Sequence, residues 1–193
     1  MTDLPEGPFD IALADPPWRF TSNSDAKPGR NARRHYDTMR LPEIKAMPVQ
    51  DMMARPALLF LWTTSPHLYQ AMGVLDAWGA KYVSQLVWEK DRIGTGFWVR
   101  NRHEIVLLAK WGKFPCPKPA PFSDSLFSGQ QREHSRKPDF LHEAIESAWP
   151  DARKVELFAR TERPGWTAWG NETDKFNTES ANNGADRTSH SPA

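Results

Sequence analysis

The tetrapeptide Asp15-Pro16-Pro17-Trp18 has the composition of a small acceptor site. Two successive prolines remove two backbone N–H donors and fix φ, so Asp15 is held extended and the carbonyls of Asp15 and Pro16 are left as acceptors. These groups suit a flat base whose exocyclic amino group donates two hydrogen bonds while its ring stacks on Trp18. A proline-stiffened turn with a core tryptophan explains the same residues equally well.

Two further polar groups could complete a site with this tetrapeptide. Lys137 precedes an expected helix at 138–149, where an ammonium, backbone N–H donors and the helix dipole would together bind a carboxylate or a phosphate. Asn171 and Glu172 follow Gly170, and with the strand end Phe158-Ala159-Arg160 they could receive ribose hydroxyls. Taken separately, a surface lysine before a helix and a polar turn are the commoner explanations.

Two polar loops carry clustered cations. Residues 21–34 are rich in Ser, Asn, Gly and Arg without periodic apolar positions, which predicts a mobile loop. Its Arg33 and Arg34, followed by Tyr36, would suit phosphate contacts, although a solvated basic loop with no partner is about as common. The second loop, 89–102, contains a Gly-Thr-Gly that has neither P-loop nor dinucleotide-binding spacing.

Short apolar runs place these polar groups at the ends of strands. We expect strands at 9–14, 57–62, 83–88, 105–109 and 154–160. Helices are expected at 42–54, with a break at Pro48, at 66–78 and at 138–149. An extended crossing is expected at 114–122 and a turn-rich segment at 161–170. Alternating strands and helices predict an α/β fold with a largely parallel sheet, in which ligands bind at the carboxyl ends of the strands.

Composition limits the classes of protein that fit. A chain of 193 residues suits one domain, expected at 1–172, and the polar composition of 173–193 predicts a disordered tail. The formal net charge of +1 means that affinity for a polyanion would have to come from local clusters. A single cysteine, Cys116, excludes an intramolecular disulfide and a multi-cysteine zinc site, and scattered His and Glu offer no convincing third ligand, so no metal is expected. Without a signal peptide or membrane span, a reducing cytoplasm is the expected compartment.

Several blocks of sequence occur in a fixed order between Phe9 and Glu172. These are Asp15-Pro16-Pro17-Trp18, Leu59-Phe60-Leu61-Trp62-Thr63-Thr64, Gly96-Phe97-Trp98-Val99-Arg100-Asn101-Arg102-His103-Glu104, Ser135-Arg136-Lys137-Pro138-Asp139, Arg153-Lys154-Val155-Glu156-Leu157-Phe158-Ala159-Arg160, Gly165-Trp166 and Gly170-Asn171-Glu172. Together they resemble the MT-A70 family of adenine-N6 methyltransferases. The last four blocks are the most specific, and chance does not readily produce so many in the right order and spacing.

The resemblance implies a Rossmann-like methyltransferase fold, with helices on both faces of a mostly parallel sheet and the catalytic motif preceding the cofactor-binding strand. It implies S-adenosylmethionine as methyl donor, with Asp15, Pro16, Pro17 and Trp18 as the catalytic motif. Lys137 would meet the methionine carboxylate of the cofactor and Asp15 both the methyl donor and the target amine. The ribose side would fall to Phe158, Arg160, Asn171 and Glu172. The residues implied for the target adenine and its strand are Trp18, Arg33, Arg34, Tyr36, Trp62, Arg100, Asn101 and Glu104.

The same resemblance sets expectations for substrate and partners. The substrate would be nucleic acid, with DNA favoured because the compact form is similar to stand-alone bacterial or phage enzymes. RNA, and a non-catalytic nucleic-acid-binding subunit of a methyltransferase complex, are the alternatives. The chain would act as a monomer or homodimer, or with a partner subunit, and away from membranes. Family relatives carry a segment that helps enclose the cofactor's adenine, whereas eight residues precede Phe9 here.

Overall fold

The computed structural model describes residues 3–19, 38–94, 98–131, 136–171 and 173. The elements in chain order are β1 (Phe9–Ala14), α1 (Leu41–Lys45), the 3-10 turn η3 (Val49–Met52), β2 (Met53–Thr63), the 3-10 turn η4 (Ser65–His67), α2 (Leu68–Ala77), β3 (Lys81–Lys90), β4 (His103–Trp111), β5 (Leu126–Gly129), α3 (Phe140–Ala148), β6 (Lys154–Leu157) and β7 (Trp166–Trp169). Within the described residues, no helix is long and apolar enough to cross a membrane.

A central seven-stranded sheet has the order β5-β3-β4-β2-β1-β6-β7. Strand β1 pairs in parallel with β2 and β6, while β4 pairs antiparallel with both β2 and β3. Strands β5 and β7 pair in parallel with their neighbours β3 and β6. Among the described strands, β4 therefore runs against all the others. The start of β4 consequently lies at the same edge of the sheet as the carboxyl ends of β1, β2, β3 and β6.

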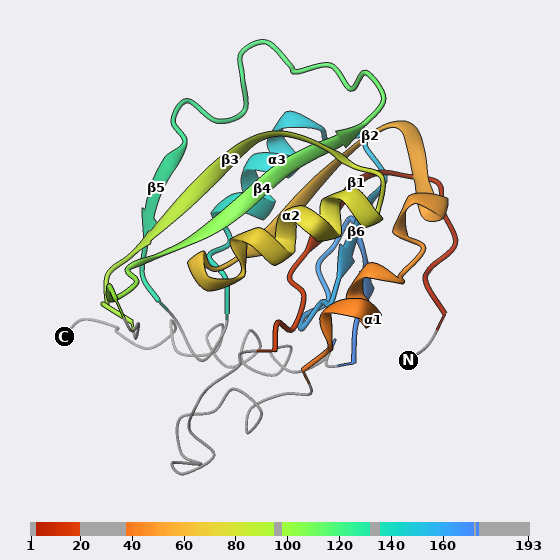
Figure 1. Ribbon diagram of the computed structural model, residues 1–193. Helices are drawn as coiled ribbons and strands as arrows, with labels where there is room; N and C mark the ends of the chain where they lie inside the picture. Colours follow the sequence, from red (N-terminus) through yellow and green to blue (C-terminus); the bar gives the residue numbers. More distant parts are fainter. Residues whose placement is uncertain (1–2, 20–37, 95–97, 132–135, 172, 174–193) are drawn as a thin grey trace, which may run out of the picture.

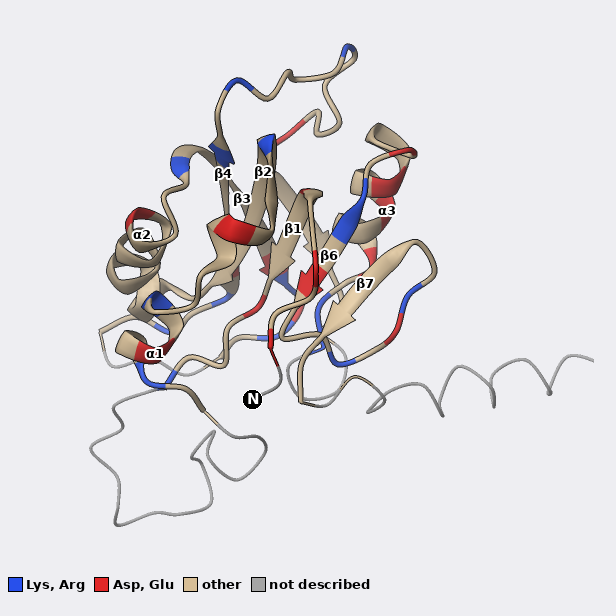
Figure 2. Cartoon of the chain, turned by 90° about the vertical axis from the view of Figure 1, so that its right-hand side faces the viewer, with Lys and Arg blue, Asp and Glu red and all other residues tan. Residues whose placement is uncertain are grey.

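Helices cover both faces of this sheet, as the family resemblance implies. In Figure 2 the sheet stands between α1 and α2 on one side and α3 on the other. Successive residues of β1 show why both faces need a cover: Ala12 packs in the cluster that includes α1 and α2, and Leu13 in the cluster that includes α3. Because side chains alternate along a strand, the apolar residues 11–14 of β1 point to both faces of the sheet and are buried only when both faces are covered.

Most differences between expectation and structure lie in the outer strands, although β2 already begins at Met53, inside the range 42–54 expected to be helical. The sequence does not predict β5, and β7 lies inside the expected turn-rich segment 161–170. Both are four-residue strands at the two edges of the sheet, and so short a run leaves too little periodicity to identify a strand. The expected strand 154–160 ends at Leu157, because Phe158 adopts a positive φ of 63°. The predicted loop at 21–34 and all of the predicted tail except Thr173 lie outside the described residues.

Candidate active site

Polar side chains from four separate segments meet at the edge of the sheet where β1 ends. Asp15 follows β1, Glu104 lies at the start of β4, Lys90 ends β3, and Lys137 lies three residues before α3. These segments are brought together because β4 enters the sheet at this edge, next to β2 and β3 (Figure 1). The site is thus built from residues far apart in the sequence, with 122 positions separating Asp15 from Lys137.

The four side chains form a chain of alternating charges, which we call the charged tetrad. The ammonium of Lys137 donates to Asp15 Oδ2 at 2.6 Å and lies 3.4 Å from Glu104 Oε2. The other oxygen of that carboxylate, Glu104 Oε1, accepts a hydrogen bond from Lys90 Nζ. Side-chain exposure within the tetrad is only 15–19%. Two cations and two anions therefore neutralise one another in a mostly buried position.

Burial and pairing act in opposite directions on the ionisation of this tetrad. Burial lowers the pKa of Lys137, but the carboxylates of Asp15 and Glu104 outweigh it and hold that pKa above its ordinary value. Burial likewise raises the pKa of Glu104, yet Lys137 and Lys90 bring it below its ordinary value. Both groups are consequently charged at neutral pH. Arg160 opposes the protonation of Lys137, so its guanidinium also belongs to the electrostatic surroundings of the site.

Two tryptophans support the cations of the tetrad. Lys137 Nζ lies 5.3 Å from the ring centroid of Trp62, and Lys90 Nζ lies 5.1 Å from that of Trp88. The two indoles meet edge to face with their centroids 6.1 Å apart. Because an ammonium over an indole face is attracted by the ring quadrupole, this arrangement holds both lysine side chains in place and stabilises their positive charges. Trp62, implied by the family resemblance as a substrate residue, is placed here as a buried support for Lys137.

The tetrapeptide forms a tight turn, and one of its carbonyls differs from expectation. The backbone N–H of Asp15 donates to Leu157 of β6 at 3.3 Å, which anchors the turn to the neighbouring strand. The Pro16 carbonyl, expected to be left open, accepts a hydrogen bond from the Trp18 N–H at 2.8 Å. A carbonyl oxygen has two lone pairs, so Pro16 can still accept one further hydrogen bond. The Pro17 carbonyl accepts from the N–H of Met39 at 3.1 Å.

Trp18 is placed as a core residue. Only 6% of it is exposed, its ring stacks on His67 with centroids 5.6 Å apart, and its Nε1 donates to the Trp62 carbonyl at 3.1 Å. A base could therefore stack on Trp18 only after this packing rearranged. His67 is in turn fixed by Thr64 Oγ1 at 3.0 Å, and burial lowers its pKa, which favours the neutral imidazole. The core-tryptophan alternative weighed from the sequence describes this residue better than the stacking platform does.

The turns after β6 and β7 approach each other closely. Phe158 adopts a left-handed conformation with φ 63°, uncommon for an aromatic residue, and packs edge to face on Trp169 at 5.6 Å. The Ala159 N–H donates to the Trp169 carbonyl at 2.9 Å. A Cβ on Gly170 would lie 2.4 Å from the Ala159 carbonyl oxygen, so only glycine permits this approach. Arg160 and Asn171 therefore lie on adjacent turns at the edge of the sheet where β1 ends.

Other predicted residues lie farther out or outside the described chain. Arg100 is exposed in the loop between β3 and β4, where its Nε donates to the Gly94 carbonyl at 3.2 Å. Asn101 is half-buried in the same loop, and its carbonyl accepts from the Gly94 N–H at 2.7 Å. Their proximity to a target base stays a prediction. The predicted residues outside the described part of the chain are Arg33, Arg34, Tyr36 and Glu172.

Two members of the site were not identified from the sequence. Lys90 lies two residues after Trp88 on the same strand, so the period of two would have placed it on the same face had the strand been extended to residue 90. No sequence signal distinguishes His67, the stacking partner of Trp18, from an ordinary residue at a helix start.

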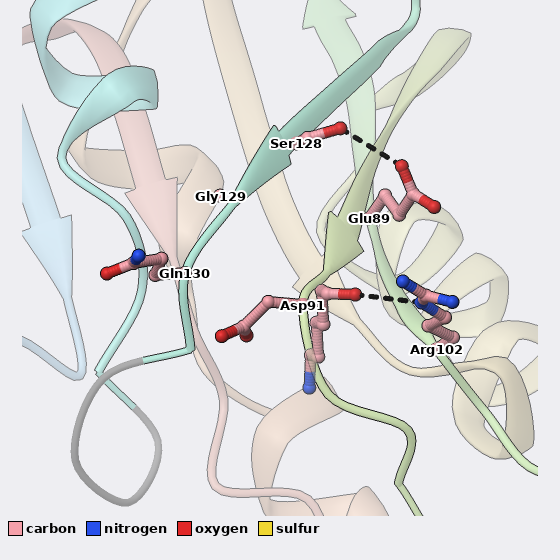
Figure 3. Close-up of a pocket in the computed structure, with 7 residues that line it drawn as sticks. Glu89, Asp91, Arg102, Ser128, Gly129 and Gln130 are labelled. Atoms are coloured by element: carbon pink, nitrogen blue, oxygen red, sulfur yellow. Dashed lines mark hydrogen bonds between the residues drawn. The ribbon is translucent and has the colours of Figure 1, made fainter.

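Lys90 also lines a pocket between β3 and β5, together with Glu89, Asp91, Arg102, Ser128, Gly129 and Gln130 (Figure 3).

Several known proteins are similar to this chain over most of its length. The sequence pattern of the MT-A70 family matches residues 9–172. The chain is 30% identical over 185 residues to the Type II methyltransferase M.MunI of Mycoplasma sp., covering 88% of this chain and 79% of that protein. It is 31% identical over 176 residues to an N(6)-adenosine-methyltransferase MT-A70-like protein of Arabidopsis thaliana, covering 86% and 24%, and 28% identical over 182 residues to the human N(6)-adenosine-methyltransferase catalytic subunit METTL3, covering 87% and 29%. The chain thus spans most of the length of M.MunI but less than a third of the length of the other two proteins. Because the family pattern covers residues 9–172, the chain belongs to the MT-A70 family.

Proposed function

We propose that this chain transfers the methyl group of S-adenosylmethionine to N6 of adenine in DNA. Family membership and relatives named for adenosine-N6 methylation identify an adenine-N6 methyltransferase. The cofactor, the polymer and the residue roles are the parts that we add. The observation that carries the proposal is the Asp15–Lys137 contact of 2.6 Å, at the edge of the sheet where β6 and β7 also end.

The charges at this edge fit S-adenosylmethionine. That molecule carries a carboxylate together with an ammonium and a sulfonium, so a matching site needs both cations and anions. The tetrad supplies the ammonium of Lys137 beside the carboxylates of Asp15 and Glu104. The guanidinium of Arg160 is near enough to repel the same ammonium. We assign Lys137 to the methionine carboxylate and Asp15 to the positively charged part. Phe158, Arg160, Asn171 and Glu172 are assigned to the ribose side.

Asp15 and Pro16 would orient the target amine. When bound, S-adenosylmethionine supplies an electrophilic methyl group. The amino nitrogen of adenine is a poor nucleophile because its lone pair is delocalised into the ring. Asp15 Oδ1 and the second lone pair of the Pro16 carbonyl would each accept one amino proton, which favours a more pyramidal nitrogen whose lone pair points toward the methyl group. Lys137 on Asp15 Oδ2 fixes the orientation of the carboxylate and leaves Oδ1 to face the amine.

The proton leaves through the same carboxylate. An amino proton becomes acidic only once the nitrogen has been methylated, so Asp15 need not be a strong base. The remaining members of the tetrapeptide have supporting roles: Pro17 stiffens the turn, and Trp18 fastens it to β2 through the Trp62 carbonyl.

DNA is favoured over RNA by the extent of the matches. The chain covers 79% of the Type II methyltransferase M.MunI, whereas it covers 23–29% of the relatives whose names specify adenosine. A target in duplex DNA must be extruded from the stack, which costs a few kcal/mol. Since Trp18 and Trp62 are buried, we assign contacts with the extruded base and its strand to Glu104, Arg100 and Asn101. Arg33, Arg34 and Tyr36, which lie outside the described residues, are assigned to the same strand.

The role of Asp15 is tested by substitution. Asp15→Ala should abolish formation of N6-methyladenine while calorimetry still detects S-adenosylmethionine binding. Asp51→Ala, an exposed aspartate in η3 away from the site, is the matched control and should keep full activity. An active Asp15→Ala protein would refute the assigned role. Wild-type protein that shows no heat of S-adenosylmethionine binding and methylates neither DNA nor RNA would instead identify a non-catalytic subunit.

A further inference from the structure

We propose that Lys90 is a positioning residue for methyl transfer, acting through Glu104 and Lys137 on the Asp15 carboxylate. This inference rests on the proposed function of Asp15. Lys90 is not adjacent to the tetrapeptide in sequence, and its ammonium contacts Glu104 directly. Glu104 in turn lies 3.4 Å from the Lys137 ammonium that donates to Asp15 Oδ2.

The backbone of Lys90 is held on both sides. Its N–H donates to the Arg102 carbonyl at 2.9 Å, and its own carbonyl accepts from Arg102 Nε at 3.1 Å. The side chain is then fixed by its position over Trp88, at 5.1 Å from the ring centroid, and is only 16% exposed. An ammonium held at so many points is suited to fixing the position of a partner, because little side-chain freedom remains to be lost.

Glu104 shows what Lys90 contributes. Each oxygen of its carboxylate faces a different ammonium, Lys90 at Oε1 and Lys137 at Oε2. Without Lys90, this carboxylate would attract Lys137 without competition. The Lys137 ammonium would then move toward Glu104 and away from Asp15, to which its present distance is the shorter one, 2.6 Å against 3.4 Å. Lys90 thus keeps Lys137 on Asp15 Oδ2, so that Oδ1 faces the target amine.

A different role for Lys90 gives different kinetics. Lys90 and Arg102 both line the pocket of Figure 3, where a cation could bind a phosphate of the substrate directly. The charges lining that pocket balance, since the lining holds the carboxylates of Glu89 and Asp91 as well as the two cations, and Lys90 already pairs with Glu104. A phosphate contact would appear mainly in the KM for nucleic acid and in its salt dependence, whereas a positioning role appears mainly in kcat.

The test compares Lys90→Met, Lys90→Gln and Lys90→Arg with wild type. Lys81→Met is the control, because it makes the same change at the opposite, exposed end of β3. We expect Lys90→Met and Lys90→Gln to lower kcat by roughly 10- to 100-fold with little change in the KM for nucleic acid, and Lys90→Arg to recover part of the loss. Lys81→Met should behave as wild type. Urea unfolding measured on each variant establishes that the kinetics refer to folded protein.

A second readout follows Glu104 without any ligand. Its carboxylate is faced by Lys90 from β3 and by Lys137 from the segment before α3, with Asp15 after β1 and Arg160 after β6 acting on Lys137. In a carbon-13 NMR titration, Lys90→Met should raise the pKa of Glu104, and Lys90→Arg should keep it low.

Three results would overturn the inference. The first is a kcat of Lys90→Met equal to wild type, and the second is an effect confined to KM and its salt dependence. The third is loss of folding in both uncharged variants, which would make Lys90 a stability residue. If the wild-type protein itself produces no methyladenine, the proposed function fails and this inference fails with it. An active wild type with unaffected Lys90 variants refutes the inference alone.

Discussion

The Asp15–Lys137 pair should contribute measurably to the stability of the ligand-free protein. At an effective dielectric constant of about 20, two unit charges 2.6 Å apart attract by roughly 6 kcal/mol, most of which is offset by the desolvation of both groups. Removing one partner of a buried pair costs about 3–5 kcal/mol, because the other charge remains without compensation. Since the tetrad keeps 15–19% side-chain exposure, we expect Lys137→Met to cost about 3 kcal/mol, at the lower end of that range.

A double-mutant cycle separates this pair from its surroundings. Asp15→Asn should cost less than Lys137→Met, because Lys137 keeps Glu104 at 3.4 Å. The double variant should be more stable than the sum of the single effects predicts, by about 1–3 kcal/mol. Urea unfolding followed by tryptophan fluorescence near neutral pH measures all four proteins. The exposed Arg40–Glu43 pair is the matched control and should show no measurable coupling.

The same pair should lose its stabilising effect at alkaline pH. The pKa of Lys137 is raised in the folded protein, so its contribution is fully present below the unfolded value of about 10.4 and is lost as the pH rises through the folded pKa. The stability difference between wild type and Lys137→Met should therefore shrink above about pH 10.4. Additive effects in the cycle, or a difference that grows at alkaline pH, would refute this account of the pair.

Three further predictions concern other parts of the site. The pKa of Glu104 is lowered in the folded protein, so its contribution is present above the ordinary value of about 4.3 and is lost as the pH falls through the folded pKa; the stability difference from Glu104→Gln should vanish in acid, and a constant difference would contradict this. Gly170→Ala should weaken S-adenosylmethionine binding in calorimetry, because a Cβ would lie 2.4 Å from the Ala159 carbonyl oxygen, and unchanged affinity would count against the proposed cofactor turns. Trp18→Phe should lower the free energy of unfolding in urea by about 1–3 kcal/mol, since the Trp62 carbonyl loses its buried donor, and unchanged stability would rule out that bond as an anchor.

Sequence patterns predict the centre of the sheet better than its edges. The central parts of β1, β2 and β4, residues 11–14, 57–62 and 105–109, are wholly apolar because both of their faces are covered, and such runs are conspicuous in a polar chain. Strand β5 has the sequence Leu-Phe-Ser-Gly, and its four positions are alternately exposed and half-buried. Its residue types do not alternate between apolar and polar in the same way, so the sequence contains no strand pattern there. The early end of β6 depends on the positive φ of Phe158, a conformation that its residue type argues against.

The site illustrates the same distinction at the level of single residues. Asp15 is identifiable because two prolines follow it directly, so the signal is local. Lys137 is recognisable as a cation near a helix start, but its partners Asp15 and Glu104 belong to parts of the sequence far from it. Which carboxylates an ammonium contacts depends on strand order, and β4 reaches this edge only because it runs against its neighbours. The local sequence therefore identifies Lys137 as a cation that could bind an anion, but it does not reveal that Lys137 belongs to the charged tetrad.

Product analysis tests the central claim most directly. Duplex DNA, single-stranded DNA and RNA are each incubated with the protein and S-adenosylmethionine, digested to nucleosides and analysed by mass spectrometry, with Asp15→Ala in parallel. We predict N6-methyladenine in DNA with the wild-type protein and none with Asp15→Ala. Methyladenine confined to RNA would correct the polymer while keeping the chemistry. Absence of N6-methyladenine from all three polymers, with protein that is folded and binds the cofactor, would contradict the account.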